Sequence, residues 1–320
     1  MKRIGVLTSG GDAPGMNAAI RAVVRTALYH GVEVCGIRRG YAGLLAGEIE
    51  PMSSPSVGGI INRGGTILRT ARSEEFRTEA GLHQAAQVLA QHGIDALVVI
   101  GGDGSMRGAI ALRRYAKLQV IGIPATIDND IPGTDYSIGF DTAVNTAMDA
   151  IDKIRDTAYS HERVFVIEVM GRHNGFIALE VGLAGGAEAI LIPEVPYDLS
   201  DLLRRLDESY QRGKHSSIIV VAEGAARAAD VQKFLEMHTP YRIRALVLGH
   251  MQRGGSPTAF DRVLATQFGV LAVERLLKGG TDEMVGIEGG KLITVPIEYV
   301  QMTTRTVDAR KLEIATMMAI

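Results

Sequence analysis

Short runs of β-branched residues, most of them ending in glycine, alternate along the chain with longer amphipathic stretches. Most of the short runs lack polar alternation, and strands that are apolar on both faces belong to parallel sheets covered by helices. The pattern therefore predicts an α/β fold with doubly wound, mostly parallel sheets. The expected strands are residues 3–7, 33–37, 96–100, 119–123, 164–169, 217–222 and 245–248.

The amphipathic stretches predict helices between these strands. In the first of them, apolar residues from Ala18 to Ala27 fall at helical spacing, and Gly31 ends the stretch. This strand-turn-helix order puts glycine-rich turns at the carboxyl ends of strands, where open α/β sheets bind ligands. The expected helices are residues 17–30, 82–92, 105–115, 142–159, 198–211 and 258–277, with a connecting loop at 47–65, a strand at 292–295 and a terminal helix after it.

Composition narrows the class of function. Of the 320 residues, 46% are hydrophobic and 22% are charged, which is ordinary globular usage. The formal net charge of −2 gives the whole molecule no attraction to nucleic acid or to an anionic membrane, so any anion site must be local. The single cysteine, Cys35, excludes an intramolecular disulfide and is expected as a buried strand thiol. No signal peptide or membrane span is recognised, and we expect a cytoplasmic protein.

Two glycine-rich turns are candidate phosphate loops. Residues 8–15 follow the first strand, and residues 101–105 follow the strand at 96–100; each turn opens a helix. Glycines let backbone N–H groups approach a phosphate, while the helix N-terminus adds positive potential. Asp103 in the second turn suits Mg²⁺ bridging two phosphates. A structural tight turn explains the first loop as well, and a helix N-cap Asp supported by Ser105 explains the second.

A third turn carries two carboxylates two residues apart, Asp128 and Asp130, after the strand at 119–123. If the segment is extended, both carboxylates point the same way. Like charges raise the pKa of one carboxylate, whereas a nearby metal lowers it, which gives one base and one charge holder. A polar turn with Asx caps is the alternative interpretation.

Two further turns add cations at strand ends. Arg172 follows the strand at 164–169 and suits the charge that develops on a transferring phosphoryl group. His250 and Arg253 follow the last expected strand of this series, and together they suit a phosphate monoester. Singly, such side chains are more often surface or capping groups. Five turns rich in Gly, Asp and Arg on one sheet edge favour a ligand site.

Together these motifs resemble the bacterial ATP-dependent 6-phosphofructokinase family, from residue 2 to about Gly279. Gly-Gly-Asp-Gly also occurs in NAD and lipid kinases, whereas Thr126–Asp130 with the following Pro132-Gly133-Thr134 is much more specific. The resemblance implies two Rossmann-like domains with the active site in the cleft between them. Residues 1–138 with about 251–301 would form the larger, ATP-binding domain, and residues 139–250 with about 302–320 the smaller, sugar-phosphate-binding domain.

The resemblance implies phosphorylation of D-fructose 6-phosphate at its 1-hydroxyl by Mg-ATP, giving fructose 1,6-bisphosphate and ADP. Asp128 is then the general base, with Thr126 and Arg172 as further catalytic residues and Asp103 on Mg²⁺. The implied ATP site comprises Gly11, Tyr41, Arg72, Ser73, Gly102, Asp103, Gly104 and Ser105. The implied sugar-phosphate contacts are Thr126, Asp128, Asp130, Met170, Gly171, Arg172, Glu223, His250 and Arg253, with Arg163 and Arg244 serving a neighbouring subunit of a homotetramer.

Two positions bear on the phosphoryl donor. Pyrophosphate-dependent relatives have aspartate where this chain has Gly104 and lysine where it has Ala125. A side chain at the first position would fill the path of the α-phosphate, and Ala125 supplies no cation to a short inorganic donor. Both positions favour ATP.

The family's allosteric site for ADP or phosphoenolpyruvate resembles a further set of residues, but the match is incomplete. Where relatives place more charges, this chain has Ser54, Gly59 and His215. We therefore expect weak effector binding at neutral pH, with His215 restoring charge as the pH falls. Arg21 and Arg25, at i and i+4 of one helix, are also typical of a solvated helix face. The implied effector residues are Arg21, Arg25, Arg155, Gly186, Glu188, Arg212, Lys214 and His215.

Three other functions compete with this kinase. A pyrophosphate-dependent phosphofructokinase shares the fold and differs in its donor. A non-catalytic nucleotide sensor would be expected to lack the base or the arginine, yet Asp128 and Arg172 are both present. A dinucleotide oxidoreductase fails because residues 10–15 lack the glycine spacing of that fingerprint.

Overall fold

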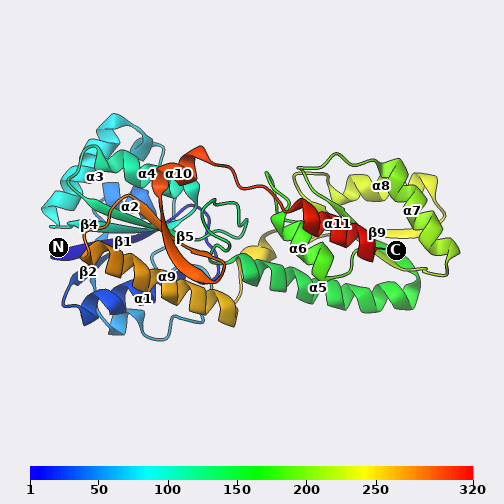
Figure 1. Cartoon of the computed structure of the whole chain (residues 1–320), viewed down its shortest axis with the longest axis horizontal. Helices are drawn as coiled ribbons and strands as arrows, with labels where there is room; N and C mark the ends of the chain where they lie inside the picture. Colours follow the sequence, from blue (N-terminus) through cyan, green and yellow to red (C-terminus); the bar gives the residue numbers. More distant parts are fainter. Residues whose placement is uncertain (320) are drawn as a thin grey trace. The chain divides into compact units, whose positions relative to one another are not determined.

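The computed structural model describes residues 1–319, which form two compact units (Figure 1). Unit 1 comprises Met1–Thr142 and Arg253–Arg305, and unit 2 comprises Ala143–Gln252 and the C-terminal segment from Thr306. The chain therefore passes between the units three times. Within the described residues, no helix has the length and apolar character needed to cross a membrane.

Unit 1 is built on a seven-stranded sheet in the order β11-β10-β5-β4-β1-β2-β3. The five inner strands run parallel, and β3 and β11 pair antiparallel at the two edges. The central strands are apolar on both faces, which confirms the expectation of buried parallel strands. The strands are β1 (Arg3–Ser9), β2 (Glu33–Ile37), β3 (Ile49–Met52), β4 (Ala96–Gly101), β5 (Gln119–Pro124), β10 (Glu283–Glu288) and β11 (Lys291–Pro296).

Helices cover both faces of this sheet (Figure 1). On one face, α2, α3, α4 and α10 pack through a continuous apolar core that includes Leu44, Leu89 and Met106. On the other, α1 and α9 pack so closely that a Cβ atom on Gly269 would lie 2.5 Å from the Cβ of Ala22. The helices are α1 (Met16–Tyr29), α2 (Gly40–Leu45), α3 (Glu79–Gln91), α4 (Asp103–Arg113), α9 (Ala259–Leu277) and α10 (Ile297–Met302), with 3₁₀ turns η1 (Pro55–Val57) and η2 (Glu75–Arg77).

Two expectations for unit 1 were wrong in detail. The stretch 47–65 was expected as a connecting loop, but it contains β3 and the 3₁₀ turn η1. Pro51 is tolerated in β3 because an edge strand need not donate from its outer side. The helix α4 begins at Asp103, two residues before its expected start, with Gly102 as its N-cap.

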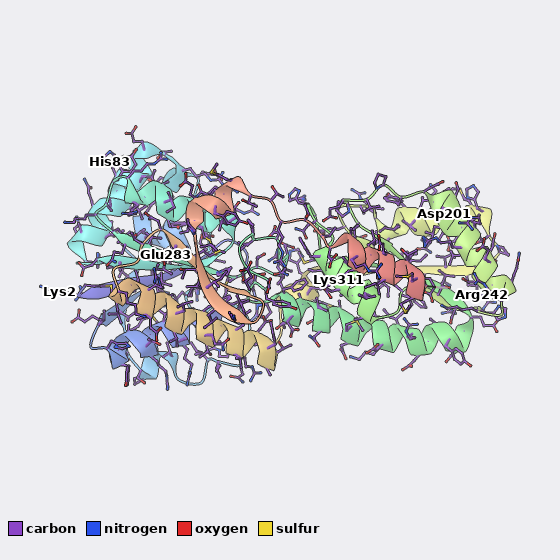
Figure 2. The ribbon with its side chains drawn as sticks, viewed as in Figure 1. Lys2, His83, Asp201, Arg242, Glu283 and Lys311 are labelled. Atoms are coloured by element: carbon purple, nitrogen blue, oxygen red, sulfur yellow. The ribbon has the colours of Figure 1, made fainter. Side chains whose placement is uncertain are left out.

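Unit 2 carries a four-stranded parallel sheet in the order β7-β8-β6-β9. Helices α7 and α8 pack on its core, α6 packs on β7 and β8, and α11 packs on α6. An ion pair between Lys311, labelled in Figure 2, and Glu180 joins α11 to α6. The elements are β6 (Arg163–Val169), β7 (Ala189–Leu191), β8 (Ser217–Ala222), β9 (Arg242–Val247), α5 (Phe140–His161), α6 (Phe176–Ala184), α7 (Leu199–Gln211), α8 (Ala228–His238) and α11 (Ala309–Met318), with the 3₁₀ turn η3 (Gly249–Arg253).

The strand β9 begins three residues before its expected start at Ala245. Its first residues, Arg242, Ile243 and Arg244, alternate between exposed and buried, as in an edge strand. Arg242 is labelled in Figure 2. The prediction relied on an unbroken apolar run, and this alternation hid the start of the strand.

The starts of α5 and α9 cap each other. Asp261, in the first turn of α9, is fully buried and accepts hydrogen bonds from the backbone N–H groups of Gly139 and Thr142, both at 2.9 Å. In return, the hydroxyl of Thr258, the N-cap of α9, donates to Asp141 Oδ2 at 2.6 Å. Burial raises the pKa of Asp261 to about 6, although these hydrogen bonds favour its ionised form.

Candidate active site

A cleft of about 720 Å³ opens in unit 1 where β1, β4 and β5 end. Each of the three glycine-rich or acidic turns contributes to its lining, and so does Arg253. The expectation that all five turns lie on one sheet edge was wrong, because the turns that carry Arg172 and His250 follow β6 and β9 of the other sheet. Three of the five turns do share one edge of the sheet in unit 1. The lining residues that the sequence had singled out are Gly11, Tyr41, Arg72, Ser73, Gly102, Gly104, Ser105, Ala125, Thr126, Asp128 and Arg253.

The first turn approaches the side chain of Arg253 closely. A Cβ atom on Gly11 would lie 2.6 Å from Arg253 Nη1, so glycine is required for this arrangement. The same Nη1 donates a hydrogen bond to the carbonyl oxygen of Asp12 at 3.3 Å. Gly10 has a φ of +86°, a backbone conformation that glycine adopts without strain. The turn thus presents its main chain to the cleft, beside the guanidinium group of Arg253.

The second turn brings the N-terminus of α4 to the cleft. Gly102 is the N-cap and provides no side-chain cap, so Asp103 lies inside the helix and the N-cap interpretation of this aspartate was wrong. A Cβ atom on Gly101 would lie 2.4 Å from the carbonyl oxygen of Ser9, which ties this turn to β1. By contrast, a Cβ atom on Gly104 would meet no atom of the described residues within 4 Å, apart from its chain neighbours and the backbone of its own helix. The open space at Gly104 and the uncapped helix end suit a phosphate chain.

Asp103 has one carboxylate oxygen available for a cation. Its Oδ1 is buried and has no hydrogen-bond partner in the described part of the chain, while Oδ2 pairs with Arg107. No group of three or more His, Cys, Asp or Glu side chains gathers as a metal site within residues 1–319. One carboxylate fits Mg²⁺, which typically takes one or two protein ligands and completes its shell with phosphates and waters.

The third turn is not extended. The condition under which Asp128 and Asp130 were expected to point the same way is therefore not met. Asn129, between Asp128 and Asp130, has a φ of +52°, and residues 127–128 form a turn. Thr126 Oγ1 accepts a hydrogen bond from the backbone N–H of Asp128 at 3.2 Å. The pKa of Asp130 is raised, first because surrounding protein desolvates its carboxyl and second because the Asp128 carboxylate repels its charge.

The cleft has an apolar end that the sequence analysis largely missed. The rings of Tyr41 and Phe76 stack with centroids 4.0 Å apart, and Leu82 and Ala111 line the same cleft. Tyr41 donates from its hydroxyl to the carbonyl oxygen of Ser105 at 2.5 Å, and burial raises its pKa. We call this apolar end of the cleft, lined by Tyr41, Phe76, Leu82 and Ala111, the apolar slot. Its apolar lining suits a nucleotide base.

One feature of the sequence could have indicated this slot: a glycine, Gly108, inside the helix α4. A Cβ atom on Gly108, in the middle of α4, would lie 2.9 Å from the Tyr41 ring and 3.1 Å from the Phe76 ring. Glycine costs stability in a helix interior, so its presence there indicates a close approach. Arg77 and Arg107, which also line the cleft, were not singled out either.

Arg72 and Ser73 reach the cleft on a long loop that two buried polar side chains hold down. Asn17 of α1 donates to the carbonyl oxygens of residues 63 and 64 and accepts from the backbone N–H of Ile67 at 2.7 Å. Thr8 of β1 donates to the carbonyl oxygen of Arg69 at 2.9 Å. The loop that carries Arg72 is therefore fixed to the first strand and the first helix.

In unit 2, several expected sugar-phosphate residues gather at one sheet edge. Met170, Gly171 and Arg172 follow β6, Glu223 follows β8, and His250 follows β9, and the carboxyl ends of parallel strands share an edge. The backbone joins two of these turns, since the N–H of Gly224 donates to the carbonyl oxygen of Gly171 at 3.0 Å. Arg172, Glu223 and His250 are exposed in the single chain.

Arg163 lies at the other edge of the same sheet. It is the first residue of β6, about 20 Å along the strand from Met170 at ~3.3 Å per residue. Arg244 lies on the neighbouring strand, opposite Phe165, so both arginines share one face of the sheet. Arg163 Nε is buried without a hydrogen-bond partner among the described residues. The structure therefore separates Arg163 from the turn at 170–172 within unit 2.

The expected effector residues divide between the units. Arg21 and Arg25 lie on α1 of unit 1, and the others lie in unit 2. There, the buried carboxylate of Glu188 pairs with Lys214 at 2.6 Å. Arg155 donates to the carbonyl oxygen of Gly186 at 3.3 Å.

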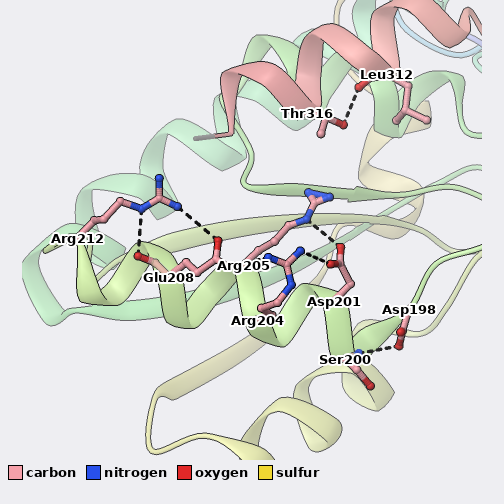
Figure 3. Close-up of polar contacts among 9 residues, drawn as sticks. All are labelled: Asp198, Ser200, Asp201, Arg204, Arg205, Glu208, Arg212, Leu312 and Thr316. Atoms are coloured by element: carbon pink, nitrogen blue, oxygen red, sulfur yellow. Dashed lines mark hydrogen bonds and ion pairs between the residues drawn. The ribbon is translucent and has the colours of Figure 1, made fainter.

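Two more of these residues have partners on α7. Arg212 donates from Nε to the carbonyl oxygen of Glu208 at 3.1 Å, and its Nη2 lies 3.8 Å from Glu208 Oε2 (Figure 3). Further along α7, Arg204 and Arg205 both pair with Asp201. The ring of His215 lies edge-on against Tyr210, with centroids 4.4 Å apart. Arg212 and Lys214, two of the expected effector cations, are thus already paired with carboxylates of the same chain.

Comparison with known proteins agrees with this geometry. The chain is 56% identical over 319 residues to a Thermotoga petrophila protein named ATP-dependent 6-phosphofructokinase, and 56% identical over 320 residues to a Bacillus subtilis protein of the same name, with all of each chain covered.

The solved phosphofructokinase of Saccharomyces cerevisiae is 41% identical with a TM-score of 0.89; the match covers 94% of this chain and spans 46% of the yeast chain. A pyrophosphate-dependent phosphofructokinase from Marinobacter aquaeolei is 25% identical with a TM-score of 0.87, covering 100% of this chain and 92% of its own. The family model described as phosphofructokinase matches residues 3–276, and the chain belongs to the phosphofructokinase family.

Proposed function

We propose that this chain transfers the γ-phosphoryl group of ATP to the 1-hydroxyl of fructose 6-phosphate, giving fructose 1,6-bisphosphate and ADP. The observation that carries the proposal is that the uncapped N-terminus of α4 lines the same cleft as Thr126 and Asp128 of the acidic turn. Relatives that are 56% identical over their full length and are named ATP-dependent 6-phosphofructokinase support the same reaction.

The donor assignment rests on two small residues in the cleft. Gly104 faces open space, and Ala125 brings no charge. The stacked pair Tyr41 and Phe76 offers an apolar slot at the same cleft. Pyrophosphate has no base to fill such a slot, so the slot favours ATP. The fold alone does not separate the two donors, because a relative described as pyrophosphate-dependent has a TM-score of 0.87.

A metal ion is proposed to bind beside the cleft, at Asp103, which lies between the lining residues Gly102 and Gly104. Asp103 would hold Mg²⁺ through its buried Oδ1, together with the donor phosphates. When bound, Mg²⁺ would neutralise charge on the phosphoryl oxygens.

Asp128 is proposed as the general base. Its carboxylate would take the proton of the sugar 1-hydroxyl as the hydroxyl oxygen bonds to the γ-phosphorus and the bond from that phosphorus to the β,γ-bridging oxygen breaks. Asp130, the second carboxylate of this turn, is proposed as a contact to the sugar. Arg172 would stabilise the charge that develops on the transferred group, with Thr126 holding the Asp128 turn.

The remaining sugar-phosphate roles are assigned to residues of unit 2 and to Arg253. We assign the 6-phosphate to His250 and Arg253 and to Arg163 and Arg244 of a neighbouring subunit in a homotetramer. The position of Arg163 at the opposite edge of the sheet from Met170 supports its use by another subunit. Met170, Gly171 and Glu223 complete the proposed sugar contacts.

A coupled assay with fructose 6-phosphate and Mg²⁺, run with ATP or pyrophosphate in turn, tests the reaction and its donor. We expect turnover with ATP alone; turnover only with pyrophosphate overturns the donor assignment, and nucleotide binding without turnover points to a sensor. Asp128→Ser should lower kcat by at least ~10²-fold with much smaller changes in substrate KM. Asp152→Asn, an exposed carboxylate on α5, is the matched control and should leave kcat unchanged.

Effector control is proposed to be weak. Arg212 and Lys214 already pair with Glu208 and Glu188, so an effector phosphate must compete with carboxylates of the same chain. We expect micromolar ADP or phosphoenolpyruvate to leave the fructose 6-phosphate saturation curve unchanged. A shift of that curve at micromolar effector would contradict this expectation.

A further inference from the structure

Asn129 lies between the proposed base Asp128 and its neighbour Asp130 in an unusual backbone conformation. Its φ is +52°, in the left-handed region that most side chains avoid and that asparagine tolerates better than most. The residue is only 3% exposed. A buried polar side chain in this conformation needs partners, and those partners show what the conformation achieves.

The Asn129 side chain spans its own loop. Its Oδ1 accepts a hydrogen bond from the backbone N–H of Ser137 at 2.8 Å, and its Nδ2 donates to the carbonyl oxygen of Asp135 at 3.2 Å. The amide group is therefore used as both acceptor and donor. It joins the start of the loop at 126–137 to its end across eight residues.

Ser137 completes the closure from the other side. Its hydroxyl, on a residue that is 1% exposed, donates to the carbonyl oxygen of Thr126 at 2.7 Å and lies 3.2 Å from Asn129 Oδ1. The next residue, Ile138, donates from its backbone N–H to the carbonyl oxygen of Pro124 at 3.0 Å. Both ends of the loop are thus tied to each other where β5 ends.

We infer that Asn129 and Ser137 form a clamp that positions the Asp128 carboxylate in the cleft, with Asn129 as a positioning residue for phosphoryl transfer. The expected loss of kcat rests on the proposed function, whereas the clamp itself does not. A left-handed residue directly after Asp128 sets the direction of the chain at the base, and the clamp holds that residue in place. Small displacements of a reacting group, near 1 Å, cost on the order of 10²-fold in rate.

Asn129→Gly tests the clamp, because glycine accepts the positive φ while removing the side-chain hydrogen bonds. We expect kcat to fall by about 10²-fold, with KM for ATP within about threefold of the unchanged protein. Ser137→Ala should act through the same clamp, so the double variant should lose little more than the worse single variant. Asn62→Gly, the same change on an exposed loop, is the control and should leave kcat unchanged.

Amide hydrogen exchange over residues 126–137 provides a readout that needs no activity. Faster exchange in this loop alone, in both single variants, supports the clamp even if the chain proves not to phosphorylate fructose 6-phosphate. Unchanged loop exchange overturns the clamp. A third outcome would also overturn the positioning inference: kcat and ATP affinity fall equally, and exchange becomes faster throughout unit 1. Asn129 would then have only a general structural role.

Discussion

The guanidinium group of Arg253 occupies the space that a methyl group on Gly11 would need. A Cβ atom on Gly11 would lie 2.6 Å from Arg253 Nη1 and 3.3 Å from its Cζ. These two residues are far apart in the sequence, yet they approach each other at the mouth of the cleft where the first turn follows β1. This close approach links the first glycine-rich turn to Arg253, one of the cations proposed to bind the sugar phosphate.

Gly11→Ala should therefore act through Arg253. The clashing atom is the far end of a flexible side chain, so the protein should fold while the guanidinium moves away. We expect kcat/KM for fructose 6-phosphate to fall at least ~10-fold with little change in melting temperature. In a double-mutant cycle, Gly11→Ala should add little to Arg253→Ala. Fully additive losses would show that the glycine matters for another reason.

Gly104→Asp should separate donor choice from folding. Apart from its chain neighbours and the backbone of its own helix, none of residues 1–319 comes within 4 Å of a Cβ atom at this position, so the variant should be about as stable as the original chain. The new carboxylate would fill the cleft and repel the donor phosphates, and turnover with ATP should fall by at least ~10²-fold. Steady-state rates with ATP and with pyrophosphate provide the measurement. An unchanged KM and kcat for ATP would remove Gly104 from the donor site.

Much of unit 1 could be predicted because parallel strands buried on both faces leave a clear mark. The strand at 33–37 was predicted to the residue, and the other inner strands to within two residues, apart from β10. Short or edge elements left weaker marks: β7 has three residues, and β9 begins with alternating polar positions. The free thiol of Cys35 is buried in β2, as its apolar neighbours indicated.

The candidate site also has a part that could be predicted from the sequence and a part that could not. Glycines and carboxylates in turns could be identified because phosphate binding requires them in a recognisable order. The slot formed by Tyr41 and Phe76 depends on a 3₁₀ turn and on one face of α4, and no local motif encodes that meeting. The conformation of Asn129 was equally hidden, because the pattern of residues around it does not reveal a positive φ.

Asp261 should make stability depend on pH in a defined window. Its folded-state pKa of about 6 lies above the ordinary value near 3.8, so between about pH 4 and pH 6 the folded protein keeps a proton that the unfolded chain loses. This contribution to stability is fully present below about pH 4 and is lost as the pH rises through 6. The nearby charge of Asp141 acts in the same direction as burial.

The difference in unfolding free energy between the original chain and Asp261→Asn should therefore decrease as the pH rises from 4 to 6, by up to about 3 kcal/mol, and stay level above that range. Urea titrations at several pH values measure it. Asp152→Asn, which is exposed, should give a level difference throughout. A level difference for Asp261→Asn would show that its carboxyl titrates normally.

The proposed use of Arg163 by a neighbouring subunit predicts complementation between two inactive variants. Arg163→Ser and Asp128→Ser should each be nearly inactive alone. When the two variants are unfolded, mixed and refolded together, some sites should receive an intact aspartate from one subunit and an intact arginine from another, and activity should reappear. Mixing folded variants without exchange of subunits is the control. No recovery in verified mixed oligomers would assign Arg163 to the site of its own chain.

The three passages of the chain between the units have a consequence for synthesis. Unit 2 is nearly continuous, since Ala143–Gln252 supplies all four strands of its sheet. Unit 1 needs α9, β10 and β11, which the ribosome makes only after residue 253. During translation, therefore, the second unit can assemble its sheet while the cleft of unit 1 still lacks Arg253, so this cleft is complete only after residue 253 has been made.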